Sequence, residues 1–295
     1  MQRSEISATE IRNMSMSFIS NTCSISLLRT NSSHNRSPVL CRASNPPRDG
    51  KSAVRQMKDA VQQALRSRIS RIDLEMPVGM NLGVQKEDEG DVEMAKAVLN
   101  MFEGTGLTVK CLVCENKSLK LLQNWTGTKA TIEQFDKASK VSSSKSNMGF
   151  GKKRMAKNDK CDVYVVVAPK SSDMKRIADL SLTFGMNRLI LLVNARLDGV
   201  DWPEAEVKEA ILDSFQRVFI YKIDPHPQWT GGVLFRKFPD DWLLLKRNTV
   251  GAVDRLLETE EQPSLDQISN AFREKAENPS SNIFDSLSGL FQRKS

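Results

Sequence analysis

Two uninterrupted apolar runs, separated by an amphipathic segment, place the strongest constraint on how this chain can fold. Val163–Ala168 reads VYVVVA and Leu189–Val193 reads LILLV. Between them, Met174, Ile177 and Ala178 recur at the spacing of one helix face. Continuous apolar strands are typical of sheets that are covered on both faces. The pattern therefore predicts parallel strands between two layers of helices.

The same alternation of helices and strands extends along the chain. Helical spacing is found over 54–65, 92–102 and 207–215, and strand-like patterns over 69–76, 108–114 and 218–223. We predict an α/β fold, a three-layer sandwich with a mostly parallel sheet, in a single domain over 49–250. Val233–Phe238 and Trp242–Lys246, joined by a Pro-Asp-Asp turn, add a C-terminal antiparallel hairpin.

The first 48 residues differ from the rest and are typical of an organelle-targeting peptide. They hold six arginines against two glutamates, are rich in serine and threonine, and lack the long apolar core of a secretory signal. The stretch VLCRA at 39–43 is similar to the processing site of plastid transit peptides. We predict a chloroplast transit peptide over 1–48 and a location in the stroma. A mitochondrial or simply disordered leader is the alternative.

Net charge limits the partners that the mature chain can attract. The leader carries +4 of the formal net charge of +7, so residues 49–295 hold only +3. The longest apolar runs fall far short of the roughly 20 residues that cross a bilayer, so we expect no transmembrane helix. A mildly basic protein of this kind does not have the overall charge of a dedicated nucleic-acid binder.

Positive charge is concentrated in a polar segment over 126–159, which we expect to be a flexible basic insertion. Lys152, Lys153 and Arg154 are its candidate binding residues, because such a cluster can contact nucleic acid, anionic lipid headgroups or an acidic partner. A solvated loop with no binding role is the alternative. Only Phe150 interrupts the cluster as an aromatic residue, so stacking on single-stranded nucleic acid is disfavoured.

Beyond the predicted domain, residues 251–295 are expected to form a helical extension with an amphipathic end. Apolar residues over 282–292 recur at helical spacing after a breaker at 278–281. The final helix is expected either to pack back on the domain or to dock on a membrane surface or a partner.

Known catalytic and metal-binding patterns are not matched. Cys111 and Cys114 lie in a predicted strand with side chains on opposite faces, so two core cysteines are the expected interpretation. His226, between two prolines, is the only histidine after the leader and is expected in a turn. The glycines at 79–83 lack the Gly-Lys-Ser/Thr of a nucleotide loop. We therefore assign no catalytic residue, no metal and no cofactor.

A small ligand, if one binds, is expected beyond the carboxyl ends of the parallel strands. Lys170, Ser171, Asn194 and Arg196 are the main candidates for this edge, and Asn81, Glu115 and Asp224 follow other strands. This placement supports an alternative function, a small-molecule or nucleotide-binding plastid enzyme. Helix caps and salt bridges explain the same residues equally well.

Arg236 is the remaining candidate, within the stretch GGVLFRKFPDDW. Strand alternation places it on one hairpin face with Leu234 and Phe238, so its charge points among apolar neighbours. Buried charges are normally paired, and an aspartate at 224, 240 or 241 is the expected partner. This favours a structural role for Arg236, with binding of an anion or of a partner as the alternative.

Three segments resemble a known family: NARL at 194–197, FQRVFIY at 215–221 and GVLFRKFPDDW at 232–242. The chain resembles the plant and cyanobacterial domain-of-unknown-function family that contains the third Low-PSII-Accumulation protein. The resemblance runs from about residue 55 to residue 247. It implies a plastid protein that aids photosystem II biogenesis together with thylakoid assembly factors, and it implies no established chemistry.

Our leading expectation is a chloroplast accessory protein without enzymatic activity. It is expected to assist photosystem II assembly or thylakoid protein biogenesis through protein–protein contacts. Thylakoid assembly factors or photosystem II subunits are the expected partners, with peripheral contact at the thylakoid membrane.

Overall fold

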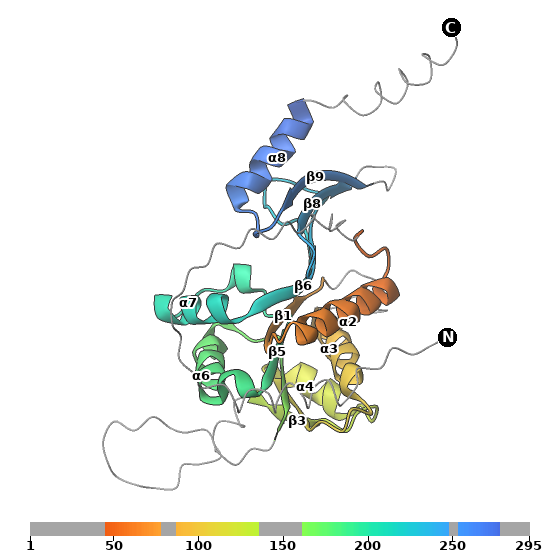
Figure 1. Ribbon diagram of the computed structural model, residues 1–295, viewed down its shortest axis with the longest axis vertical. Coiled ribbons are helices and arrows are strands. Elements are labelled where there is room, and N and C mark those ends of the chain that lie inside the picture. The colour runs from red at the N-terminus through yellow and green to blue at the C-terminus, as the bar shows by residue number, and fades with distance from the viewer. Residues whose placement is uncertain (1–44, 78–86, 136–160, 248–252, 278–295) are drawn as a thin grey trace, which may run out of the picture.

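Nine strands form one mixed sheet at the centre of the computed structural model, which describes residues 45–77, 87–135, 161–247 and 253–277. The strand order is β3-β2-β4-β5-β1-β6-β7-β8-β9 (Figure 1). The strands are β1 (Arg71–Glu75), β2 (Val109–Val113), β3 (Thr131–Gln134), β4 (Val163–Val167), β5 (Leu189–Val193), β6 (Gln216–Ile223), β7 (Gly232–Lys237), β8 (Trp242–Arg247) and β9 (Val253–Thr259). All pairs from β3 to β6 are parallel, and all pairs from β6 to β9 are antiparallel.

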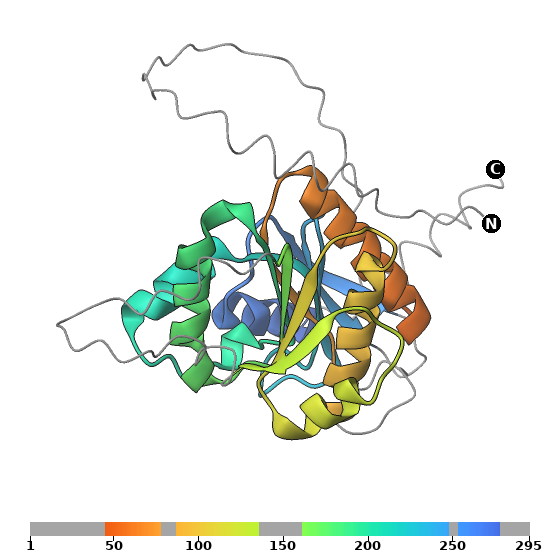
Figure 2. The same cartoon turned by 90° about the horizontal axis from the view of Figure 1, so that it is seen from below.

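Helices cover both faces of this sheet, which confirms the predicted α/β sandwich. The first layer contains α2 (Gly50–Arg66), α3 (Glu87–Leu99) and α4 (Asn116–Gln123). The second layer contains α6 (Met174–Phe184), α7 (Ala205–Ser214) and α8 (Leu265–Glu277). Figure 2 shows the two layers on opposite sides of the strands. No helix among the described residues is long and apolar enough to cross a membrane.

Strand β5 illustrates why the central strands are apolar without alternation. Leu191 and Val193 pack into the core under the first helix layer, whereas Ile190 and Leu192 pack under the second. Every residue of β4 and β5 is buried. Both faces of these strands are excluded from water, so burial stabilises an apolar residue at every position.

Local sequence signals fix the helix that covers the β6–β7 end of the sheet. Helix α2 begins after Asp49, whose carboxylate accepts a hydrogen bond of 2.7 Å from the backbone N–H of Ser52. Ser52 in turn accepts one from the backbone of Asp49, which completes a capping box. Met57 and Val61 are on the face of α2 that packs into the core. The capping box therefore sets the residue at which α2 begins, and the apolar stripe sets which face of α2 packs on the sheet.

Arg71 connects the central strand to the end of α6, although sequence patterns gave no indication of this role. Its guanidinium is buried and donates to the Ser181 hydroxyl at 2.8 Å, to the Ser181 carbonyl at 3.1 Å and to the Gly185 carbonyl. These carbonyls belong to the C-terminal end of α6, where a cation is favourable. Burial lowers the pKa of Arg71 to about 10. Arg71 of β1 therefore caps the C-terminal end of α6.

Two predicted domain boundaries were wrong. The segment expected as an insertion from residue 126 contains β3, which pairs in parallel with β2 at the edge of the sheet. The segment expected as a purely helical extension from residue 251 contains β9, which pairs with β8 before α8 begins. Both are edge strands that mix polar and apolar residues and are only partly buried, so they lack the apolar pattern that marks a strand in sequence.

The interpretations of the cysteines and of His226 are confirmed by their positions. Cys111 packs under the first helix layer and Cys114 against the second, and both are free thiols. Burial raises the pKa of the Cys111 thiol to about 12, so this thiol stays protonated. His226 lies in a turn, where its Nδ1 accepts a hydrogen bond of 3.1 Å from the backbone of Gln228.

Candidate binding site between α7 and α8

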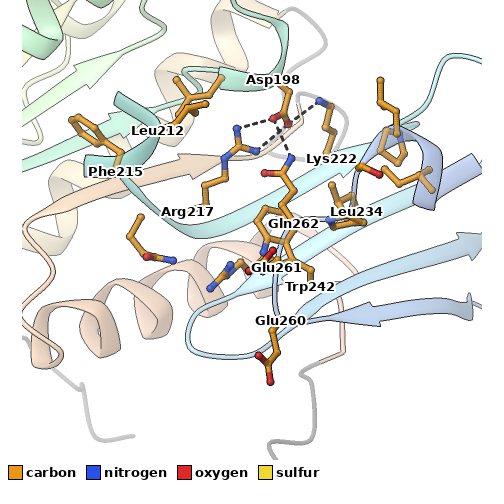
Figure 3. Close-up of a pocket in the computed structure, with 18 of the residues that line it drawn as sticks. Asp198, Leu212, Phe215, Arg217, Lys222, Leu234, Trp242, Glu260, Glu261 and Gln262 are labelled. Carbon is orange, nitrogen blue, oxygen red and sulfur yellow. Dashed lines mark hydrogen bonds and ion pairs between the residues drawn. The ribbon is translucent and has the colours of Figure 1, made fainter. Parts of the chain in front are cut away.

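A cavity of about 870 Å³ opens on the second helix layer, between α7 and α8, with β6, β7 and β8 behind it. We call it the central pocket. Leu212 of α7 and Ile268 of α8 lie on opposite walls, and Leu234, Arg236 and Trp242 come from β7 and β8. Figure 3 shows charged and apolar side chains side by side around this cavity. Its volume lies within the range of about 300 to 1,000 Å³ that is usual for small-molecule sites.

Behind the pocket, the central strand presents charged side chains to the second helix layer. β1 reads RIDLE, and Ile72 and Leu74 pack under the first helix layer. Alternation therefore turns the other three side chains toward the opposite face. Asp73 is fully buried, and no hydrogen bond reaches either of its carboxylate oxygens within the described ranges. Burying three charged side chains on one face of a strand is costly unless they are paired or hydrogen-bonded.

Arg217 of β6 lies over Asp73, with 3.9 Å between its Nε and the Asp73 Oδ2. Burial raises the pKa of Asp73 to about 7, although the charge of Arg217 acts in the opposite direction. Burial likewise raises the pKa of Glu75, against the charge of Lys222. Asp73 is therefore partly neutral near neutral pH, and burial disfavours the charged form of Glu75 as well.

At the pocket, Asp198 accepts hydrogen bonds from both Arg217 and Lys222. It receives two hydrogen bonds from Arg217, of 2.7 and 3.0 Å, and one of 3.2 Å from Lys222 (Figure 3). Gln262, from the segment that leads into α8, donates a fourth at 3.1 Å. Burial alone would raise the pKa of Asp198, but the hydrogen bonds and charges of Arg217 and Lys222 outweigh it and lower the pKa to about 2. Asp198 is therefore ionised at all physiological pH values.

Arg236 points into the same pocket but is held differently. Its guanidinium lies over the ring of Trp242, 5.2 Å from the centroid. Its buried Nε has no hydrogen-bond partner, and no carboxylate of the described residues lies within ion-pair distance. Burial lowers the pKa of Arg236; the charge of Asp241 opposes this and that of Arg217 adds to it.

The predicted environment of Arg236 was therefore half right. Leu234 and Arg236 do share one face, which is the face toward the pocket. Phe238 lies just beyond the end of β7 and packs against the core under the first helix layer instead. Asp224 is not the partner, because its carboxylate accepts a hydrogen bond of 2.7 Å from the backbone of Gly231. An aromatic ring, instead of an aspartate, contacts the arginine.

Gly232 of β7 allows α8 to form one wall of the central pocket. A Cβ at Gly232 would lie 2.9 Å from Cζ of Phe272 and 3.1 Å from Cδ of Pro225. Phe272 is buried and stacks on Trp229, with 5.5 Å between the ring centroids. Gly232 therefore allows α8 to approach β7 closely.

Asn194 and Arg196, predicted at the carboxyl edge of the sheet, meet there beside a third residue. The amide of Asn194 donates to Asp91 at 2.6 Å, and Arg196 donates to the same carboxylate oxygen at 3.1 Å. The Asn194 oxygen accepts from the backbone of Met76 at 2.8 Å, which joins the ends of β5 and β1. The connection after β1 runs to the first helix layer and that after β5 to the second, so this is a topological switch point.

The backbone at this edge is unusual. Four of the five non-glycine residues with positive φ among those described follow parallel strands: Ala168, Asn194, Arg196 and Asp224. Each such conformation costs about 1 kcal/mol or more. At Asn194 the contacts to Asp91 and Met76 hold the conformation. The edge is therefore a braced structural junction, with Asn194 only 2% exposed.

The other predicted site residues are not brought together with these. Lys170 is exposed, with 3.8 Å between its Nζ and the Glu115 Oε1. The Ser171 hydroxyl accepts a hydrogen bond of 3.1 Å from the backbone N–H of Asp201. Lys152, Lys153, Arg154 and Asn81 lie outside the described residues, as does the amphipathic end over 282–292. None of the described groups of histidine, cysteine, aspartate or glutamate has three members placed to hold a metal ion.

Sequence reasoning missed Asp73, Asp198, Arg217 and Lys222. One signal was available: the alternation of Arg71, Asp73 and Glu75 in a strand between two apolar neighbours implies a charged face inside a covered sheet. The partner Asp198 could not be found this way, because it lies in a short connection after β5.

The mixed sheet, the two helix layers and the central pocket define an α/β protein with a charged, partly apolar cavity beside its antiparallel strands. The chain belongs to the family described as a domain of unknown function, DUF1995, whose family model matches residues 47–270. No curated protein and no solved structure gave a match. The family match extends beyond the resemblance predicted over 55–247 and includes β9 and the first part of α8.

Proposed function

We propose that this chain is a chloroplast accessory protein that assists photosystem II assembly by binding other proteins, and that the central pocket is its binding site. We further propose that it belongs to the branch of the family that contains the third Low-PSII-Accumulation protein. Its expected partners are photosystem II subunits or thylakoid assembly factors.

One observation carries the assignment of the site. The three segments that resemble the family belong to different parts of the fold, the connection after β5, the start of β6 and the β7–β8 hairpin, and each contributes residues to the central pocket. The first contributes Leu197, the second contributes Phe215 and Arg217, and the third contributes Arg236 and Trp242. Segments that mark a family and meet at one cavity are more simply explained by a shared binding role than by packing alone.

The chemistry of the pocket favours binding. The pocket combines the ion pairs of Arg217 and Lys222 with Asp198, an arginine at 236 that has no ion-pair partner among the described residues, and apolar walls, a combination suited to recognition of a partner surface. Arginine and tryptophan are also the residue types that contribute most to protein interfaces.

Affinity capture tests this function. The full-length chain, immobilised and incubated with solubilised thylakoids, is expected to retain a photosystem II core subunit or an identified assembly factor. An Arg236→Met chain, which keeps apolar contact with Trp242 but loses the charge, is expected to lose most of that retention. Arg255→Met is the matched control. Arg255 forms an ion pair with Glu258, with 2.6 Å between Nη1 and Oε2, and it does not line the pocket. Equal capture by all three chains, or capture by none, would contradict the proposal.

Location is tested separately. Residues 1–48 fused to a fluorescent protein are expected to direct it to chloroplasts. In fractionated chloroplasts, the mature protein is expected in the stroma and, in part, bound to thylakoids in a form that salt removes. Fluorescence in mitochondria, or a uniform cytosolic signal, would contradict the plastid assignment.

A further inference from the structure

Arg236 is a partly buried cation without an ion-pair partner among the described residues. Its guanidinium is stacked on Trp242, its Nε has no hydrogen-bond partner, and no side chain of the described residues accepts a hydrogen bond from it. Guanidinium groups in partly buried sites normally meet a carboxylate or phosphate, because an unpaired charge away from water is costly. The unused N–H donors of Arg236 can therefore bind an acceptor group of a ligand.

The charges near Arg236 leave its guanidinium without a directly bonded anion in the described part of the chain. Arg217 lies close enough for its charge to act on Arg236 unfavourably. Arg217 and Lys222 both donate hydrogen bonds to Asp198. Glu260 and Glu261 also line the pocket, but none of these carboxylates forms an ion pair with Arg236. The charge of Asp241 acts favourably on Arg236 without reaching ion-pair distance, and an anion bound directly at the guanidinium would offset the unfavourable effect of Arg217 further.

The rest of the pocket fits an apolar body attached to that anion. Leu212 and Phe215 line one end, Leu234 and Trp242 line the strand side, and Ile268 lines the side of α8. Such surfaces would cover a flat hydrocarbon skeleton of drug size. A free phosphate would leave them uncovered.

We propose that the central pocket binds an amphipathic organic acid, with its carboxylate at Arg236 and its apolar body between α7 and β7. The inference rests on the proposed function only in using the same pocket. The carboxylate would accept a paired hydrogen bond from the planar guanidinium, a geometry that arginine offers and lysine does not.

Calorimetric titration of the full-length chain tests this proposal with three probes of one shape. 2-Naphthoate carries the carboxylate, 2-naphthalenemethanol is neutral, and 2-naphthylmethylammonium is a cation. Wild-type protein is expected to bind 2-naphthoate at least about tenfold more tightly than the alcohol, as for a charge-assisted hydrogen bond, and to bind the cation least. Inorganic phosphate alone is expected to bind weakly. Equal affinity for acid and alcohol would overturn the proposal.

Two variants of the central pocket test where 2-naphthoate binds. Arg236→Met is expected to weaken 2-naphthoate binding by about 10- to 100-fold and to leave the alcohol nearly unchanged, whereas Arg255→Met is expected to change neither. Leu212→Trp provides a second test, because Leu212 is 39% exposed and the change narrows the pocket without disturbing the core. It is expected to weaken both probes. If 2-naphthoate binds both variants as it binds wild type, the acid binds elsewhere and the proposal is wrong.

The two proposals fail in different ways. Capture of thylakoid proteins that depends on Arg236, without any binding of 2-naphthoate, would overturn this inference and leave the proposed function standing. Binding of 2-naphthoate at Arg236 without capture of a photosystem II component would leave a ligand-binding pocket and remove the accessory function.

Discussion

Asp73 and Asp198 are two aspartates on either side of one arginine, and the structure gives them opposite titration behaviour. Asp73 is fully buried and has no hydrogen bond to its oxygens, whereas Asp198 accepts two from Arg217. Burial therefore favours the neutral form of Asp73, and hydrogen bonding favours the charged form of Asp198. The same guanidinium does not neutralise both, because only Asp198 meets it at hydrogen-bond distance.

Asp73 is expected to make the protein less stable as pH rises. Its folded pKa of about 7 lies above the value of about 3.9 in an unfolded chain, so the folded state binds the extra proton between these values. The stability contribution is present below about pH 4 and is lost as pH rises toward 7. From about pH 5 to pH 8, the free energy of unfolding of the wild-type protein, measured in urea, is expected to fall by about 2 kcal/mol more than that of Asp73→Asn. Asp213→Asn, at an exposed position, is expected to behave as wild type. Parallel pH profiles for wild type and Asp73→Asn would contradict this.

Asp198 is expected to act with the opposite sign. Its folded pKa of about 2 lies below the unfolded value, so it stabilises the protein above about pH 4 and loses that contribution as pH falls toward 2. Asp198→Asn is expected to lower the free energy of unfolding at neutral pH by about 2 kcal/mol, and this difference is expected to shrink in acid. Denaturant titrations of both proteins at several pH values measure it. A difference that stays constant down to about pH 2 would show that the carboxylate charge is not responsible.

At the scale of elements, α8 is positioned by close contact with β7. Gly232→Ala would place a methyl group against Phe272, which cannot move freely because it is buried and stacked on Trp229. We expect a loss of about 1 to 3 kcal/mol in the free energy of unfolding, and faster hydrogen exchange in α8. Gly199→Ala is the matched control, since a Cβ there meets nothing within 4 Å. Unchanged exchange in α8 of Gly232→Ala would contradict the packing assigned to this helix.

Elements could be predicted from sequence where burial on both faces enforces an apolar run. β4 and β5 are of this kind, and their strands were predicted to within a residue. β3 reads TIEQ and β9 reads VDRLLET, and edge strands of this kind mix polar and apolar residues without a buried face. Their pairing is determined by neighbouring strands, which no local pattern reveals. The basic insertion predicted over 126–159 and the helical extension predicted over 251–295 were therefore given bounds that include these strands.

The site could be predicted only in part for a related reason. Strand alternation correctly placed Arg236 with Leu234, because alternation is a local property. Its contact with Trp242 and the pairing of Asn194 with Asp91 depend on how distant segments meet. The acidic partner expected for Arg236 was wrong because a cation can also be accommodated by an aromatic face.

At the scale of the whole molecule, the parallel and antiparallel parts of the sheet have different roles. The parallel strands from β3 to β6 form the covered core, and the antiparallel strands from β7 to β9 extend it and carry α8 (Figure 1). The central pocket lies where the two parts join, bounded by α7 from the first and α8 from the second. The family match includes both parts, so the pocket belongs to the family domain as a whole.

The most direct test of the proposed role of the central pocket is photosystem II accumulation in a plant line that lacks this protein and receives either wild-type or Arg236→Met chain. Photosystem II core protein is measured relative to photosystem I, with both chains adjusted to equal abundance. The wild-type chain is expected to restore the ratio, and Arg236→Met is expected to leave it close to that of the line without the protein. Full restoration by Arg236→Met, or an unchanged ratio when the protein is absent, would contradict the assignment of the pocket or of the function.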